Sequence, residues 1–311
     1  MTLQSAIEEF LIDQQVKGNT PRTLQYYRQT LRYFQAFAGP VSMEKISLPL
    51  CKRYYLHLTE RGIASTTSQS YIRSLRAFLA WAFAEGYINE NIPARLKLPK
   101  AQRKVIDVLT DDEIKRLFAC FDLRTLTGAR NYAMCALMID SGLRLNEVVT
   151  LQAQSVHVAE GYAIVNGKGN KQRMVPLGLM TKKALVRYMG RNSESPPHET
   201  CGFRGDPGCS VQAGLFVKDE QTPIKQSTVE SLFRKLKVRA GIPRLRPHLL
   251  RHSFATRYLD NGGDVYSLQQ ILGHTSLDMV KRYVHQIPAK TIICHPQFSP
   301  LDNLAKNKDK P

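Results

Sequence analysis

The chain has 311 residues, more than one core normally organises, so two domains are expected. Hydrophobic residues make up 43% and charged residues 23%, which are globular values that exclude collagen-like, mucin-like and wholly disordered chains. The net charge of +18 favours a polyanionic partner, above all nucleic acid, and positive charge that serves solubility alone is the alternative.

The charge is spread over both halves of the chain. Residues 1–100 carry a net charge of +6 and the remainder +12, so both parts are expected to contact phosphates. The longest unbroken apolar run is 132–139, far shorter than the ~18–20 residues of a membrane span. The start of the chain lacks a basic signal region. We therefore expect a soluble, cytoplasmic protein with no membrane partner.

The first hundred residues predict a compact bundle of four helices. Thr20 followed by Pro21 is a cap residue with proline at the first helical position, and apolar residues then recur at helical spacing as far as Phe37. The four predicted segments are 2–16, 20–39, 47–61 and 65–86. Residues 1–98 are accordingly assigned to one helical domain.

The polar positions of these helices are basic or hydroxylated, which suits contact with a phosphate backbone. A solvated helix face with a good cap is the alternative for each single residue. The candidates for DNA contact are Arg22, Arg28, Arg73, Arg76, Thr66 and Thr67, with Arg32 on the same helices.

Residues 99–108 lack periodicity and predict a basic linker. A capping box at Thr110–Glu113 then begins a second domain over 109–290, which a polar tail over 291–311 follows. Helices are predicted near 129–141, from 146, and over 178–190, 227–240, 248–261, 264–272 and 276–286. Strands are predicted around 156–166 and 172–177, joined by the hairpin sequence of 166–170. The fold class is thus mostly α with a small β-sheet, or α+β.

Cysteine usage favours free thiols. Cys51, Cys120 and Cys135 lie in apolar-periodic segments and are expected to be buried. Cys201 and Cys209 lie near His198 in a long surface loop predicted over 191–213, but their spacing matches no structural zinc pattern.

Several polar residues interrupt the apolar pattern of the second domain. Arg144 follows the glycine break at Gly142, and Glu147 lies three residues later to orient it. The other residues of this set are Lys168 in the hairpin, His248 and Arg251 on one helix face, His274 at a turn and Tyr283 beyond it.

Each of these residues also has an ordinary structural explanation, as an ion pair, a solvated lysine, a helix-start histidine or a packing tyrosine. In combination they lack the carboxylate or thiolate cluster of a metal site. Arginines bind phosphate oxygens bidentately and a phenol is a nucleophile, so the combination suits a phosphodiester.

The segments SGLRLNEVVTL, GKGNKQRMVPL, HLLRHSFAT and LGHTSLDMVKRYVH resemble those of the tyrosine recombinase (phage integrase) family. The resemblance covers roughly 110–290 as the catalytic domain, and 1–98 is similar to the family's SAM-like core-binding domain. It implies a site-specific recombinase that cuts and rejoins duplex DNA through a 3′-phosphotyrosyl intermediate, with no cofactor and no metal.

The resemblance also implies a role for each site residue. Tyr283 is the nucleophile, Arg144 and Arg251 neutralise the phosphate, and Lys168 protonates the leaving 5′ oxygen. His248 holds a phosphate oxygen and helps to move the tyrosine proton. His274 braces the phosphate from the other side, and Glu147 orients the arginines.

For assembly, the resemblance implies a clamp of two domains on DNA and a homo-tetramer on two sites, with a second recombinase or an accessory factor left open. Residues 287–304 are a candidate for an exchanged segment, and packing on their own domain is the alternative. Without an added amino-terminal module, a compact Xer-like or mobile-element recombinase is expected, acting in integration, excision or resolution.

Two other functions stay open at this point. A type IB topoisomerase-like enzyme would use the same chemistry as a monomer that relaxes DNA. A catalytically inactive DNA-binding or architectural protein would keep the fold without the reaction, although the intact set of six catalytic positions speaks against it.

Overall fold

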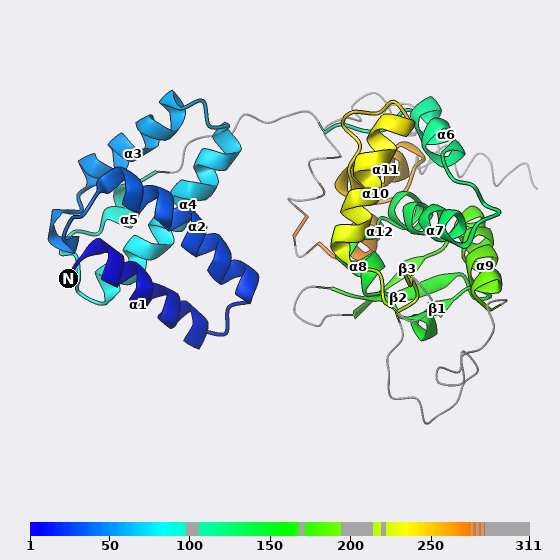
Figure 1. Cartoon of the computed structure of the whole chain (residues 1–311), viewed down its shortest axis with the longest axis horizontal. Coiled ribbons are helices and arrows are strands. Elements are labelled where there is room, and N and C mark those ends of the chain that lie inside the picture. Colours follow the sequence, from blue (N-terminus) through cyan, green and yellow to red (C-terminus); the bar gives the residue numbers. More distant parts are fainter. Residues whose placement is uncertain are drawn as a thin grey trace, which may run out of the picture. The chain divides into compact units, whose positions relative to one another are not determined.

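The computed structural model describes residues 1–97, 106–167, 172–193, 214–218, 222–274, 276–277, 280 and 283. The chain divides into two compact units, Met1–Lys104 and Val105–Pro311 (Figure 1). The described residues are mostly helical with one small sheet, which confirms the predicted fold class.

The first unit consists of helices that follow the predicted order. Helix α2 begins where the cap signal predicted, because the Thr20 hydroxyl accepts a hydrogen bond from the Thr23 amide, and it ends before Gly39 at a φ of 72°. The sequence did not predict the short helices η1 and α5. The elements are α1 (Leu3–Val16), α2 (Pro21–Ala38), η1 (Met43–Lys45), α3 (Leu48–Glu60), α4 (Ser65–Ala84) and α5 (Ile92–Arg95).

Aromatic rings form the centre of the first unit. Phe10 of α1 packs edge-on against Phe78 of α4, and Phe34 of α2 packs edge-on against Tyr54 of α3. All four side chains are almost fully buried. This core fixes the helices, and Arg22, Arg28 and Arg32 of α2 and Arg73 of α4 remain exposed.

The second unit begins at the predicted capping box. The Thr110 hydroxyl accepts from the Glu113 amide, and the Glu113 carboxylate accepts from the Thr110 amide. Helices α6 (Asp111–Ala119), α7 (Leu126–Asp140) and α8 (Leu145–Val149) follow. Helix α7 begins three residues before the predicted start, because Thr125 caps it through the Gly128 amide.

The sheet has three strands where the sequence predicted two. The predicted strand over 156–166 contains a turn that ends at Gly161, whose φ is 87°. It therefore forms two strands, β1 (Val156–His157) and β2 (Tyr162–Asn166), which pair antiparallel, after the short helix η2 (Ala153–Ser155). Strand β3 (Gln172–Pro176) pairs with β2 as the predicted hairpin, with Asn166 opposite Gln172. Residues 168–171 of the hairpin lie outside the described residues.

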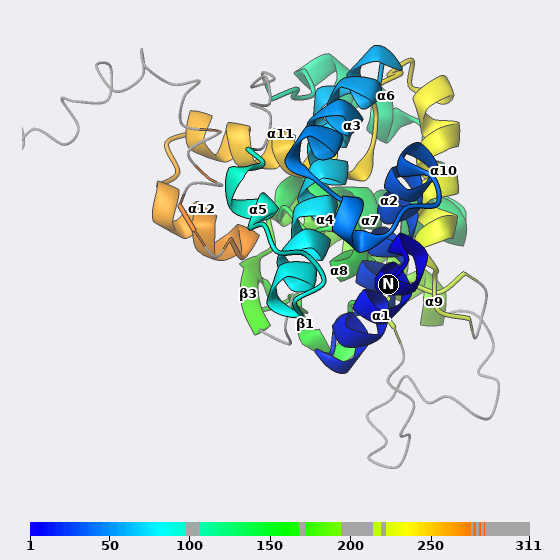
Figure 2. The same ribbon diagram turned by 90° about the vertical axis from the view of Figure 1, so that its left-hand side faces the viewer.

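Helix α7 runs through the core of the second unit, where Met134, Cys135 and Leu137 have no exposed surface, and it packs against α9 and α11. The remaining helices are α9 (Leu179–Ser193), α10 (Gln226–Arg239), α11 (Pro247–Asp260) and α12 (Val265–Leu272). Figure 2 shows α10 and α12 on opposite sides of this unit. Helix α9 extends into the predicted loop, whose residues 194–213 lie outside the described residues, as does most of the predicted helix 276–286.

No helix of the described residues is long and apolar enough to cross a membrane. Cys51 and Cys135 are buried free thiols, as predicted. Cys120 is a free thiol as predicted, but it is only half-buried: it caps the end of α6 and packs at the edge of the core. Cys201, Cys209 and the tail 291–311 lie outside the described residues.

Candidate active site

Arg144 stands at the start of α8, directly after a turn that glycine permits. Gly142 has a φ of 64°, and an added Cβ would lie 2.5 Å from the Phe254 ring. The Glu147 carboxylate accepts from both the backbone amide and the guanidinium of Arg144, each at 2.8 Å. The Arg144 side chain is 33% exposed, so part of its guanidinium faces solvent. Glu147 thus orients this arginine as the sequence predicted.

Arg173 on β3 was not among the residues singled out from the sequence. Its two terminal nitrogens donate to the two carboxylate oxygens of Glu147 at 2.8 Å, a bidentate pair. Its Nε donates to the Ile271 carbonyl at 2.7 Å. One side chain thereby joins the hairpin strand, the Glu147 carboxylate and the end of α12.

Glu147 is a buried anion among cations. Burial alone would raise its pKa, but the hydrogen bonds from Arg173 and Arg144 hold the pKa below its usual value. The carboxylate is therefore ionised at neutral pH and offsets part of the arginine charge.

Arg251 lies on the first turns of α11, which begins with proline at its first position as predicted. Its side chain is almost fully buried and donates to the carbonyls of Gly142 and Leu272. A Glu147 oxygen lies 4.0 Å away. Burial and the nearby Arg144 charge lower the pKa of Arg251 to about 9, which leaves the group protonated at neutral pH.

His274 follows α12 at a left-handed glycine, Gly273. Its Nε2 lies 3.1 Å from a guanidinium nitrogen of Arg251, while its buried Nδ1 has no hydrogen-bond partner in the described part of the chain. Burial and the charges of Arg251, Arg144 and Arg173 lower the pKa of His274 to about 4. The imidazole is therefore neutral at neutral pH, accepts from Arg251 and keeps one N–H to donate.

His248 occupies the first turn of α11 with an exposed side chain. Partial desolvation and the positive charge of Arg251 lower its pKa, so it too is neutral at neutral pH. Its ring centroid lies 6.4 Å from that of His252, one turn along the helix. Lys168 lies outside the described residues.

Tyr283 is 4% exposed, and its phenol oxygen lies 2.8 Å from Nδ1 of His252. The sequence interpretation had given the tyrosine proton to His248, whereas the contact that the structure shows is with His252. Tyr283 is also close enough to Arg251 to act on the pKa of that guanidinium. The phenol, both predicted arginines and His274 therefore come together in one chain.

Two clues in the sequence point to the residues that were missed. Along β3, Arg173 and Val175 alternate with exposed neighbours, and a charged residue at an inward position requires a partner. His252 directly follows Arg251 in the HLLRHSFAT segment. Helix α11 is buried on most sides, so no apolar stripe indicates which way that ring points.

The predicted DNA-contact residues of the first unit are mostly exposed: Arg22, Arg28, Arg73, Thr66 and Thr67. Arg76 differs, because it is half-buried and its Nε donates to the Pro93 carbonyl. Its guanidinium thus holds α5 against α4, which is a structural use of that residue.

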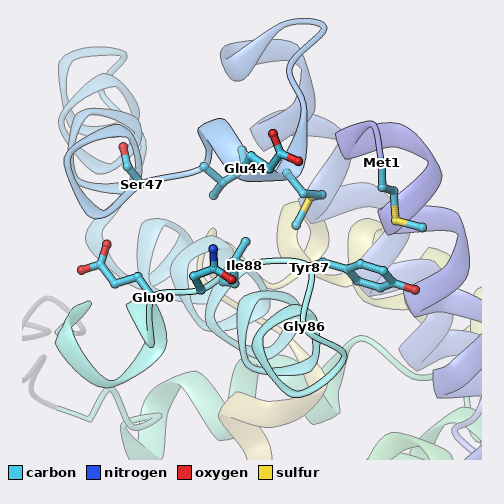
Figure 3. A pocket seen from close by; sticks show the side chains of 10 residues that line it. Met1, Glu44, Ser47, Gly86, Tyr87, Ile88 and Glu90 are labelled. Carbon is cyan, nitrogen blue, oxygen red and sulfur yellow. The ribbon is translucent and has the colours of Figure 1, made fainter.

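The first unit has a hollow that suits an anion less well than the arginine site of the second unit does (Figure 3). The charged side chains that line it, Glu44 and Glu90, are both acidic. Glu90 pairs with Arg95, and the hydroxyl of Tyr87 donates to Glu9. Among the described residues, no group of three or more His, Cys, Asp and Glu side chains could hold a metal ion.

Residues 107–290 match the Phage integrase family, and residues 2–98 match the phage integrase SAM-like domain. The tyrosine recombinase XerD of Staphylococcus aureus is 29% identical over 303 residues, covering 96% of this chain and 99% of the relative.

Two solved structures show the same fold. The Tn1549 transposon integrase in complex with circular intermediate DNA has a TM-score of 0.70 at 19% identity, covering 91% of this chain and 95% of that one. The lambda integrase tetramer bound to a Holliday junction has a TM-score of 0.67 at 18% identity, covering 89% and 78%.

Both domains match models of one family, whose members cleave and rejoin DNA with a tyrosine nucleophile. The chain belongs to the phage integrase family of tyrosine recombinases.

Proposed function

We propose that Tyr283 attacks the scissile phosphate of a specific duplex DNA site. The Tyr283 oxygen bonds to phosphorus, the bond from phosphorus to the 5′ oxygen breaks, and a 3′-phosphotyrosyl link and a free 5′-hydroxyl result. Religation by a 5′-hydroxyl reverses these steps. The observation that carries this proposal is the clustering of three groups around Arg251: His274 lies 3.1 Å from it, and Arg144 and the buried Tyr283 are close enough to act on its pKa.

The arginines supply charge where the phosphorus becomes pentavalent. Arg251 is fixed by two carbonyls and Arg144 by Glu147, so neither guanidinium has to be ordered when DNA arrives. His274, neutral and with Nδ1 unpaired among the described residues, can donate to a phosphate oxygen. His248, on the first turn of α11, is proposed to donate a hydrogen bond to a non-bridging oxygen of the scissile phosphate.

Lys168 is assigned the general acid that protonates the leaving 5′ oxygen. The pairing of β2 with β3 as far as Asn166 and Gln172, the residues on either side of the segment that carries Lys168, supports this assignment. Strand β3 also carries Arg173, which donates hydrogen bonds to Glu147 and to the Ile271 carbonyl of α12.

We infer that two DNA sites are paired by a homo-tetramer in the cytoplasm, where both domains contact phosphates. The net charge of +18 supports DNA contact, and the XerD relative together with the folds of Tn1549 and lambda integrases supports dimer resolution or movement of a mobile element. A second recombinase or an accessory factor is compatible with this scheme.

The nucleophile is tested with nicked suicide substrates from DNA that flanks the gene, resolved on a denaturing gel. The wild type should form a covalent adduct. A Tyr258→Phe control should form it too, because this variant removes a phenol oxygen from a different tyrosine, on α11. Tyr283→Phe should form none and should bind DNA with nearly unchanged affinity. An adduct with Tyr283→Phe would refute the assignment of the nucleophile.

A second experiment separates recombination from the alternatives. A plasmid with two sites should yield recombinant products. Relaxed circles without recombinants would indicate a topoisomerase-like monomer. Because Tyr283 meets Arg251 of its own chain, a mixture of Tyr283→Phe and Arg251→Ala protomers should not regain cleavage. Restored cleavage would mean that the tyrosine is donated between protomers.

A further inference from the structure

The phenol of Tyr283 has a histidine partner that the sequence comparison did not assign. Nδ1 of His252 lies 2.8 Å from the phenol oxygen, and the two ring centroids are 5.9 Å apart. His252 is half-buried and is fixed by α11, the same helix that positions Arg251. The contact therefore joins the buried phenol to a group that a helix of the site holds in place.

Burial makes this contact chemically important. A phenol has an ordinary pKa of about 10, so Tyr283 must lose its proton when it attacks phosphorus at neutral pH. The side chain is 4% exposed and packs in the core of the second unit, which restricts bulk water as an acceptor. An acceptor already in hydrogen-bond contact meets this requirement.

Other groups of the site surround His252. Arg251 lies beside it on α11, and His274 lies close enough for the charge of His252 to act on its pKa. His248 lies one turn away on the same helix. A neutral imidazole with its proton on Nε2 presents a lone pair from Nδ1 to the tyrosine O–H.

We propose that His252 is the general base for Tyr283, an inference that rests on the proposed role of Tyr283 as nucleophile. In cleavage, the proton of the phenol moves to Nδ1 as the oxygen–phosphorus bond forms and the 5′ oxygen leaves. In religation, the imidazolium returns that proton to the departing tyrosine oxygen. The negative charge that develops on the phosphate offsets the imidazolium charge.

The test is single-turnover cleavage of a suicide substrate by His252→Gln and His252→Ala. Glutamine can accept a hydrogen bond and cannot take the proton, so both variants should lose about 10²–10⁴-fold in rate. DNA affinity and the unfolding temperature should stay near those of the wild type. Cleavage by His252→Gln at the wild-type rate would overturn the proposal and leave His252 a packing partner.

The pH profile distinguishes a base from a structural residue. Without the base, the rate of His252→Ala should rise about tenfold per pH unit, because the tyrosinate fraction does so below the phenol pKa of about 10. The deficit relative to wild type should then shrink at high pH. A deficit that is equal at every pH would overturn the proposal.

A 5′-bridging phosphorothiolate substrate gives a matched control, since a sulfur leaving group needs no proton. It should restore Lys168→Ala and leave His252→Ala slow. If it restores His252→Ala, the histidine acts on the leaving group and not on Tyr283. An adduct formed by Tyr283→Phe in the same experiments would refute Tyr283 as the nucleophile, and with it the proposed function. Because the His252 variants keep Tyr283, the failure of the base proposal alone would look different.

Discussion

Replacing Glu147 by glutamine removes a buried negative charge that lies among three arginines, of which Arg251 is buried and Arg144 and Arg173 are partly buried. The carboxylate accepts four hydrogen bonds of 2.8 Å, two from Arg173 and two from Arg144, and lies 4.0 Å from Arg251. Glutamine has nearly the same shape, so the loss is that of the charge and of the arginine hydrogen bonds that its amide nitrogen cannot accept. Breaking a buried ion pair by removal of one partner costs about 3–5 kcal/mol.

Thermal unfolding is the measurement. For a domain of this size each kcal/mol lowers Tm by about 2–4 °C, so Glu147→Gln should unfold roughly 10 °C below the wild type. Asp112→Asn is the matched control, because Asp112 pairs at 3.7 Å with Lys115 while both side chains are about 80% exposed. Exposed pairs are worth ~0–1 kcal/mol, so the control should lose at most about 2–4 °C.

Arg173→Gln provides the coupling test. If Glu147 and Arg173 act as one buried pair, the double variant should lose less stability than the sum of the single variants, with a coupling of about 0.5–3 kcal/mol. Sulfate should also raise the Tm of Glu147→Gln more than that of the wild type, since it replaces the lost charge. Additive losses, or a Glu147→Gln variant as stable as Asp112→Asn, would refute the electrostatic account.

Three further predictions concern turns, pH and salt. In urea unfolding, Gly142→Ala and Gly273→Ala should each lower the free energy of unfolding by more than Gly241→Ala does. All three glycines have a positive φ, which costs about 1–2 kcal/mol for alanine. At Gly142 and Gly273 the new Cβ would also lie within 3 Å of a side chain, whereas at Gly241 it would not. His274 has a pKa of about 4 in the fold against an ordinary 6.5, so the unfolded chain binds more protons between these values. Stability should therefore fall as the pH drops from 6.5 to 4, and less steeply in His274→Gln, as followed by Tm. DNA affinity should fall steeply with salt, since each neutralised phosphate releases counterions, and a flat dependence in a binding titration would contradict phosphate contact by both domains.

Local signals explain why much of the fold was predictable. The Thr110 capping box and the Thr20–Pro21 helix start depend on residues within one turn, and the structure shows the hydrogen bonds that they predict. The hairpin between β2 and β3 likewise depends on its turn sequence. The prediction of one strand over 156–166 was wrong, because the turn that ends at Gly161 divides this segment into two paired strands.

The remaining features depend on contacts between distant parts of the chain. Arg173 meets Glu147 across 26 residues and the Ile271 carbonyl across 98, distances that periodicity does not register. His252 meets Tyr283 across 31 residues on a helix that is buried on most sides. The family segments predicted most of the candidate site residues. Tertiary packing decides which histidine contacts the tyrosine.

The arrangement of the charges explains how the site can favour the transition state over bound DNA. Arg173 has both terminal nitrogens on Glu147, so its charge is directed into the protein. In the proposed reaction Arg251 and Arg144 bind the phosphate. The carbonyls of Gly142 and Leu272 hold Arg251, and the Glu147 carboxylate holds Arg144. A phosphodiester carries one negative charge and gains more as phosphorus becomes pentavalent, so guanidinium groups held in advance stabilise the later state more. In the proposed reaction we therefore expect Glu147 to contribute to the rate by holding cations in place, although its charge offsets some of the positive charge that would bind DNA.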